Sequence, residues 1–107
     1  MSTENKPLLR HVVCFRFKDH LSPSEIQSLV DDFLNLKRQI PQIADSEGGR
    51  DVSIEGLAKG YSHCFVISFL SEKDRDDYLQ HPIHQEFAKM ILPQLADVLA
   101  IDFWQQA

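Results

Sequence analysis

The chain has 107 residues, of which 43% are hydrophobic, and its formal net charge is -5 at pH 7. This length is enough for one compact domain and too short for two, and a chain of this charge lacks the basic patch that nucleic-acid binding requires. Because no apolar run approaches the roughly 20 residues that cross a bilayer, and residues 1–7 lack the apolar stretch of a signal peptide, we expect a soluble cytoplasmic protein without membrane partners.

The first part of the chain predicts a strand followed by a helix. Residues 1–8 are polar and contain a proline, so we expect a flexible tail before a domain that spans residues 9–104. The run 11–17 is short, aromatic and β-branched, which is typical of a strand. Residues 22–25, Ser-Pro-Ser-Glu, form a capping box with proline at the first helical position, and this predicts a helix start. Apolar residues then recur every three or four positions until Pro41 ends the helix.

Two more strands are predicted in the middle of the chain. Residues 47–51 carry a Gly-Gly turn signal, and residues 51–55 then predict a short second strand. A bend at Lys59-Gly60 precedes the third strand, which we expect over residues 61–70.

The last part of the chain predicts a helical region in two pieces and a final strand. Ser71 begins the first piece, which is interrupted at His81-Pro82 because proline restricts the residue before it. The second piece follows from Ile83, and Pro93 should kink or end it; residues 98–104 predict the terminal strand.

The element order β-α-β-β-α-β predicts an α+β fold of the ferredoxin-like type, with a four-stranded antiparallel sheet and the helices on one face. Alternate strand residues are bulky and should face the helices: His11, Val13, Phe15, Phe17, Tyr61, His63, Phe65, Ile67 and Phe69. The residues between them are also apolar: Val12, Cys14, Cys64 and Val66. A soluble monomer rarely leaves a second apolar sheet face exposed to water. We therefore expect a homodimer in which two sheets close into a barrel.

Neither the cysteines nor the histidines have the spacing of a metal site. Cys14 and Cys64 lie in apolar runs without CxxC spacing, and we interpret both as small buried hydrophobic residues. The helical pair His81 and His84 spans a proline, so we expect no metal. We interpret His81 as the cap of the second helical piece and His20 as a solvated loop residue.

Residues 77–84, Asp-Tyr-Leu-Gln-His-Pro-Ile-His, contain a Tyr-x-x-His-Pro-x-His element. Together with His11, Gly-Tyr-Ser-His at 60–63 and Ile-Asp-Phe at 101–103, this element resembles the stress-responsive dimeric α/β-barrel (Dabb) family over about residues 9–104. The resemblance implies the dimeric barrel that the strand pattern predicts.

The same family includes a plant polyketide cyclase, and the resemblance to it implies that Tyr78 and His84 are catalytic and that no cofactor is needed. It also matches His11, His63 and Asp102 to residues of that enzyme. Phe33, Phe65 and Ala88 differ from the cyclase's pocket residues, which implies a smaller pocket and a different substrate.

The chemistry of His84 and Tyr78 suits proton transfer. Imidazole titrates near neutrality, so His84 can remove a proton next to a carbonyl, and the Tyr78 hydroxyl can donate to the enolate that forms. An aldol-type ring closure, an isomerisation or a decarboxylation of a small carbonyl compound would use this pair. In the alternative interpretation, both side chains bind neighbouring backbone and stabilise the helix break.

Strand pairing predicts where the other polar residues lie. The first and last strands are antiparallel neighbours, so His11 should lie near Asp102, which can orient the imidazole of His11 or of His84. Alternatively, His11 and Asp102 form a pair that only holds the strand ends together. His63 should lie at the opposite end from His11. The expected substrate-binding residues are His11, Val13, Phe33, His63, Phe65 and Phe87.

Three functions are compatible with these residues. The chain is a cofactor-free cyclase or lyase that acts on a small carbonyl compound, a protein that binds a small apolar or carbonyl ligand without converting it, or a structural stress-response dimer.

Overall fold

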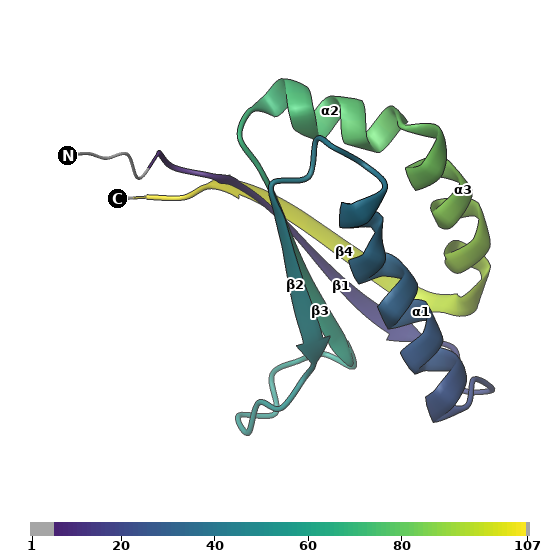
Figure 1. The fold of residues 1–107 in the computed structure, drawn as a ribbon. Coiled ribbons are helices and arrows are strands. Elements are labelled where there is room, and N and C mark those ends of the chain that lie inside the picture. The colour runs from purple at the N-terminus through teal and green to yellow at the C-terminus, as the bar shows by residue number, and fades with distance from the viewer. Residues whose placement is uncertain (1–5, 107) are drawn as a thin grey trace.

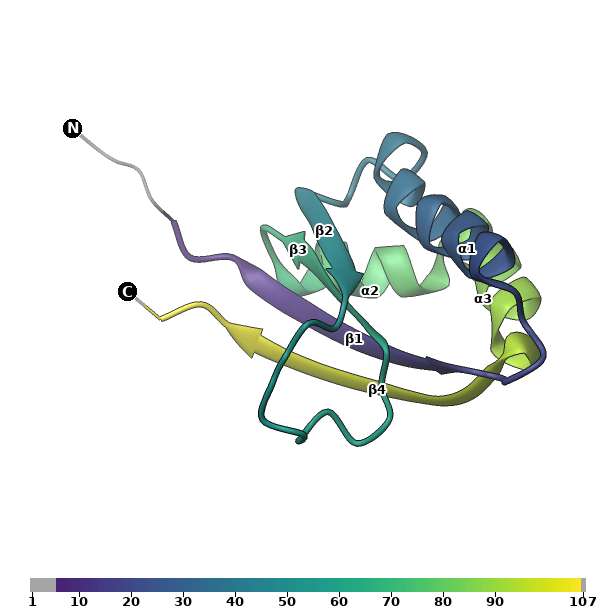
Figure 2. The ribbon, with the colours of Figure 1, turned by 90° about the horizontal axis from the view of Figure 1, so that it is seen from below.

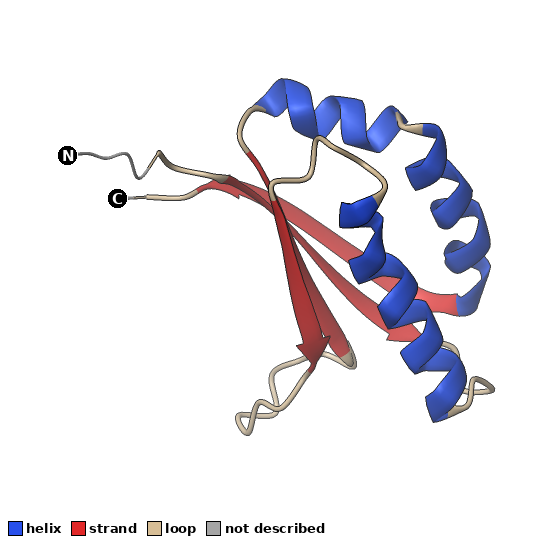
Figure 3. Cartoon of the chain, in the orientation of Figure 1, coloured by secondary structure: helices blue, strands red, loops and turns tan. Residues whose placement is uncertain are grey.

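The computed structural model describes residues 6–106, so residues 1–5 of the predicted tail lie outside the described part. Within that part, four strands and three helices follow one another along the chain (Figures 1 and 3). They are β1 (Leu9–Phe17), α1 (Pro23–Asn35), β2 (Asp45–Arg50), β3 (His63–Phe69), α2 (Glu72–Gln80), α3 (Pro82–Ile91) and β4 (Leu95–Trp104). Short 3-10 turns follow α1 at Leu36–Arg38 and α3 at Leu92–Gln94.

The four strands form one antiparallel sheet in the order β2-β3-β1-β4. The helices lie on one face of this sheet, and no element covers the opposite face in the described residues (Figure 2). The predicted ferredoxin-like α+β fold is therefore confirmed, including the division of the last helical region into two pieces. None of the helices in residues 6–106 has the length and apolar character to span a membrane.

The helix ends follow from local side-chain caps. At the start of α1, the Ser22 hydroxyl accepts from the Glu25 amide at 3.1 Å, and the Glu25 carboxylate accepts from the Ser22 amide at 2.8 Å. Between α2 and α3, His81 has an extended backbone, and its Nδ1 accepts from the Ile83 amide at 3.1 Å. The predicted capping box and the predicted cap at His81 are confirmed, and Pro82 occupies the first turn of α3.

The second strand was predicted in the wrong place. Residues 45–50 form β2, and residues 51–62 form a loop in which Val52 and Ile54 are 86% and 98% exposed. The Gly48-Gly49 pair is extended rather than a turn, because it pairs with β3 at Phe65 and Cys64. The sequence of β2 has low strand propensity, so this strand depends on tertiary pairing.

Tyr61 was also placed wrongly. It precedes β3 rather than lying in it, and its hydroxyl donates to Asp97 Oδ2 at 2.7 Å. It therefore ties the loop before β3 to β4 instead of packing under the helices.

The sheet face that the helices leave bare is apolar. Register places Val12 opposite Val66 on β3 and Ile101 on β4, so these three side chains share this face. Ile101 and Phe103 on β4 are 56% and 50% exposed.

Both cysteines lie on the bare face, opposite one another in register. Cys14 is half-buried and Cys64 is exposed, so the prediction that both are buried is wrong for the single chain. The physical reason is strand alternation, because the even positions of β1 and β3 point away from the helices. Desolvation and the contact with Cys64 raise the pKa of Cys14 to about 11.

The close pairing of β2 with β3 predicts that a side chain at Gly48 destabilises the fold. A Cβ at this position would overlap the Phe65 ring and lie 2.8 Å from the Cys64 carbonyl oxygen, whereas a Cβ at Gly49 would meet nothing within 4 Å. We expect Gly48→Ala to lower the free energy of unfolding by about 1–3 kcal/mol, as overpacking does in cores. Gly49→Ala is the matched control and should leave it nearly unchanged. Urea denaturation measures both, and equal effects of the two substitutions would contradict this packing.

Candidate functional site

Tyr78 and His84 meet where α2 ends and α3 begins. Tyr78 lies in the last turn of α2 and His84 in the first turn of α3, and the His81-Pro82 break brings their rings to a centroid distance of 4.4 Å. The Tyr78 ring also approaches His11 of β1 at 6.1 Å and Phe69 of β3 at 5.1 Å. The two helices therefore place a phenol between two imidazoles at one end of the sheet.

The Tyr78 hydroxyl is buried and has no hydrogen-bond partner among the described residues. The side chain is only 1% exposed, and burial raises its pKa, so the hydroxyl stays protonated. Leaving a buried polar group unpaired costs about 1–3 kcal/mol, and such groups in native structures are few. This hydroxyl is thus a buried donor that no described residue satisfies.

His84 is held by the backbone at the helix break. Its Nδ1 lies 3.1 Å from the Leu79 carbonyl oxygen, which can only accept, so Nδ1 carries the proton and Nε2 is left as the proton acceptor. Burial lowers the pKa of His84, and the charges of His11 and His81 lower it further, while the hydrogen bond to Leu79 opposes the shift. His84 is therefore neutral at pH 7, in the form that can accept a proton at Nε2.

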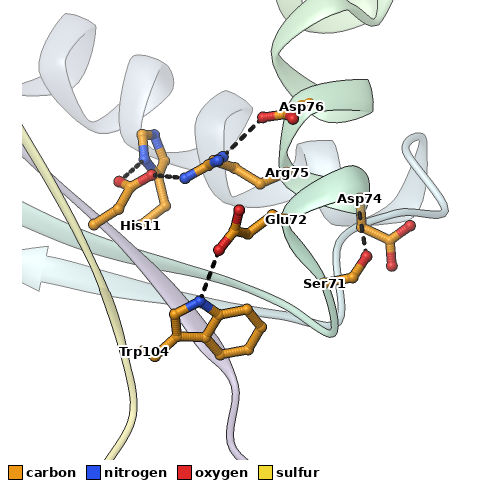
Figure 4. A network of polar contacts seen from close by, with 8 residues as sticks. His11, Ser71, Glu72, Asp74, Arg75, Asp76 and Trp104 are labelled. Atoms are coloured by element: carbon orange, nitrogen blue, oxygen red, sulfur yellow. Dashed lines mark hydrogen bonds and ion pairs between the residues drawn. The ribbon is translucent and has the colours of Figure 1, made fainter.

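His11, Asp102 and Arg75 form a chain of charge-assisted contacts. Figure 4 shows His11 and Arg75 on the carboxylate that both of them contact. His11 Nδ1 lies 2.6 Å from Asp102 Oδ1, and Arg75 Nη1 donates to Asp102 Oδ2 at 2.9 Å. Burial disfavours the charge on Asp102, but the hydrogen bonds from His11 and Arg75 outweigh it and lower the pKa of Asp102. The carboxylate is thus ionised and His11 is the donor.

Of the two imidazoles that Asp102 was predicted to orient, the structure pairs it with His11. The predicted proximity of His11 and Asp102 is confirmed, since the two residues are direct partners in the β1–β4 register. Arg75 was not predicted as part of the site, because it lies in the highly charged segment 72–77. One feature of the sequence could have indicated Arg75 as a site residue: it lies three residues before Tyr78 and therefore on the same side of α2.

A second contact of α2 with β4 supports this arrangement. Trp104 Nε1 donates to Glu72 Oε2 at 3.1 Å, one turn before Arg75 on α2 (Figure 4). Two side chains of α2 therefore anchor this helix to the end of β4, which holds Tyr78 over His11.

The expected pocket walls pack against one another. Phe33 of α1 stacks on Phe87 of α3 at 5.2 Å and meets Phe65 of β3 at 4.8 Å. Phe15 of β1 lies 5.4 Å from Phe33, and these rings are all buried, as is Val13. These side chains form a continuous aromatic core between the sheet and the helices.

His63 lies on the other side of this aromatic core from His11. It pairs with Phe15 in the register, four residues beyond His11 on β1, and its ring stacks at 6.4 Å on Phe65. The structure therefore places His63 at the opposite end from His11 and Asp102, as strand pairing predicted, and it adds Tyr78 and His84 to the His11 end. Residues 6–106 contain no group of three His, Cys, Asp or Glu side chains placed to hold a metal ion.

The sequence comparisons identify the family. The pattern of the stress responsive A/B barrel domain (Dabb) matches residues 9–105, and the chain belongs to this family. It is 40% identical over 100 residues to the stress-response A/B barrel domain-containing protein HS1 of Arabidopsis thaliana, covering 94% of this chain and 92% of that protein. It is 26% identical over 95 residues to olivetolic acid cyclase of Cannabis sativa, covering 89% and 94%.

Solved structures with this fold include an enzyme and a dimer. The hydroxynitrile lyase of Passiflora edulis superimposes with a TM-score of 0.88 at 26% identity, covering 94% of this chain and 95% of that one. A protein of unknown function from Thermobifida fusca, described as dimeric and ferredoxin-like, has a TM-score of 0.76 at 28% identity, covering 94% and 93%.

The contacts of Asp102 with His11 and Arg75 predict how the stability of the fold depends on pH. Because the pKa of Asp102 is lower in the folded state than its ordinary 3.8, its stabilising contribution is present above pH 3.8 and is lost as the pH falls through the folded value. We expect Asp102→Asn to lower the free energy of unfolding by about 1–3 kcal/mol at pH 7, and by less at pH 3. The exposed Asp32 of α1 supplies the control, Asp32→Asn. Urea denaturation at both pH values tests this, and an equal loss at pH 7 and pH 3 would contradict the ionised network.

Proposed function

We propose that this Dabb-family protein is a cofactor-independent cyclase or lyase that acts on a small, polyketide-like carbonyl compound. His84 is the general base and Tyr78 the hydroxyl donor. The observation that carries the proposal is the buried, unpartnered Tyr78 hydroxyl next to an imidazole whose Nε2 accepts a proton. Olivetolic acid cyclase and the hydroxynitrile lyase, two relatives named as enzymes, support it.

The reaction begins with proton transfer to His84. Nε2 takes a proton from the carbon next to a carbonyl, and the electron pair moves onto the carbonyl oxygen, to which the Tyr78 hydroxyl donates. In a ring closure, the enolate carbon then bonds to a second carbonyl carbon of the same molecule, and protonated His84 returns the proton to the new alkoxide. Atoms are conserved in this cycle and no cofactor is consumed.

His11 contributes a second polar group next to Tyr78. Asp102 and Arg75 hold its ring, so its Nε2 can bind a further oxygen of the substrate. Because Phe33, Phe65 and Phe87 pack closely on one another, the substrate that fits beside them is compact.

The same aromatic packing favours a second candidate function. If the core leaves no room for a substrate beside Tyr78, the chain is a non-catalytic ligand-binding or structural stress-response dimer. The name of the relative HS1, a stress-response barrel-domain protein, agrees with this candidate.

Activity measurements distinguish the two candidates. Purified protein is incubated with a panel of β-keto acids, linear polyketide-like compounds and cyanohydrins, and the products are identified by mass spectrometry. We expect His84→Gln to lower kcat by about 100- to 10,000-fold and Tyr78→Phe by about 100- to 1,000-fold. His20→Gln, at an exposed loop histidine, is the matched control and should not change kcat. Ligand binding without conversion, or full activity of His84→Gln, would reject the enzyme in favour of the second candidate.

The pH profile gives an independent test of the base. His84 must be neutral to act, and its pKa lies below the ordinary 6.5. We therefore expect kcat/KM to be flat between pH 7 and 8 and to fall only on the acid side of pH 6.5. A rate that still rises between pH 7 and 8 would contradict a base with a lowered pKa.

We further propose that the chain works as a homodimer joined through the bare sheet face. The exposed Leu99, Ile101 and Phe103 of β4 and the half-buried Val12 and Val66 on that face support this, as does the relative described as dimeric.

Introducing a charged side chain on the bare sheet face tests whether the dimer forms through it. Sedimentation of the wild type should give twice the 12.3 kDa mass of one chain, and Ile101→Asp should give the mass of one chain at micromolar concentration. Met90→Asp, at a partly exposed apolar residue of α3, should remain dimeric. A wild type that sediments as a monomer would reject the proposal.

A further inference from the structure

A groove separate from the Tyr78–His84 site lies between α1 and the β2–β3 pair. Its volume is about 420 Å³, which falls in the roughly 300–1,000 Å³ range of ligand pockets. One wall is α1, and the other is formed by the end of β2 and the start of β3. Because this groove is on the helix face of the sheet, a dimer formed through the opposite face leaves it open.

The β2–β3 wall carries positive and hydrogen-bonding groups. Arg50 and His63 are direct partners in the antiparallel register, so their side chains stand next to one another on the helix face. Ser62 Oγ lies 2.9 Å from His63 Nδ1, and a hydroxyl that donates there leaves the proton on Nε2 as a donor. Burial, followed by the charge of Arg50, lowers the pKa of His63, so this imidazole is neutral at pH 7.

Arg50 has no ion pair among the described residues, although the chain has a net charge of -5. No residue that lines the groove is acidic. One guanidinium beside a neutral imidazole matches a ligand with a single negative charge. A planar guanidinium binds a carboxylate through two parallel hydrogen bonds.

The α1 wall carries an apolar stripe with Gln27 beside it. Ile26, Val30 and Leu34 are spaced four residues apart and line the groove. At a rise of 1.5 Å per residue, this stripe is about 12 Å long. The groove thus has a cationic group on one wall and a strip for an aliphatic chain on the other.

We infer that this groove binds a small monocarboxylate with an apolar tail, such as a medium-chain fatty acid. The carboxylate is held by Arg50 and His63, and the tail lies along Ile26, Val30 and Leu34. This site is distinct from the proposed catalytic site, because the packed rings of Phe15, Phe33 and Phe65 lie between them.

Calorimetric titration with sodium octanoate tests the inference, with 1-octanol and inorganic phosphate as comparison ligands. We expect octanoate to bind once per chain, and octanol and phosphate to bind at least about tenfold more weakly. Arg50→Gln should weaken octanoate binding by about 10- to 100-fold, as the loss of a charged hydrogen bond does. Arg38→Gln, at an exposed arginine of the turn after α1, makes the same charge change outside the groove and should have no effect.

The location of the ligand is tested separately. Octanoate should shift the amide NMR signals of Ile26, Val30 and Ser62, and His84→Gln should bind it as the wild type does. Loss of binding in His84→Gln would place the ligand at the proposed catalytic site and overturn the inference without affecting the proposed chemistry there. Equal affinity for octanoate and octanol, equal affinity for phosphate, or an unchanged affinity in Arg50→Gln would also overturn it.

Discussion

The alternation of side chains along the strands is the constraint on which the rest of this structure depends. Successive residues of β1 and β3 point to opposite faces, and apolar residues occupy both. The helices bury only one face, against which Phe15, Phe65 and Phe69 pack. The other face remains apolar and bare in the single chain, and the same constraint places both cysteines there. The helix layer and the bare face are thus two consequences of a single pattern.

The break between α2 and α3 determines the geometry of the proposed catalytic site. A continuous helix would place Tyr78 and His84 six residues apart, on different sides of its axis. The cap by His81 and the proline that follows it turn the chain, so that the two rings face each other. The contacts of Arg75 and Glu72 with β4 then hold this corner over His11. Residues that make no contact with a substrate therefore set the positions of those that do.

The aromatic core divides the helix face into two ends with different chemistry. At one end two imidazoles flank a buried phenol, and a carboxylate that pairs with a guanidinium contacts one of these imidazoles. At the other end Arg50 and His63 stand beside an apolar stripe of α1. His11 and His63 thus lie in two different environments. The reason is that strand register places them on opposite sides of the Phe15 and Phe65 rings.

Local patterns in the sequence determined β1, β3, the start of α1, the helix break at His81-Pro82 and the ferredoxin-like order, because caps, proline and hydrophobic periodicity act over a few residues. Strand pairing also predicted that His11 meets Asp102. Only the tertiary structure decided the position of β2, since its Asp-Ser-Glu-Gly-Gly-Arg sequence has little strand propensity and is extended through its pairing with β3. The link from Arg75 to Asp102 joins residues 27 positions apart and depends on how α2 packs on β4. Such contacts follow from the packing of whole elements, which no local pattern specifies.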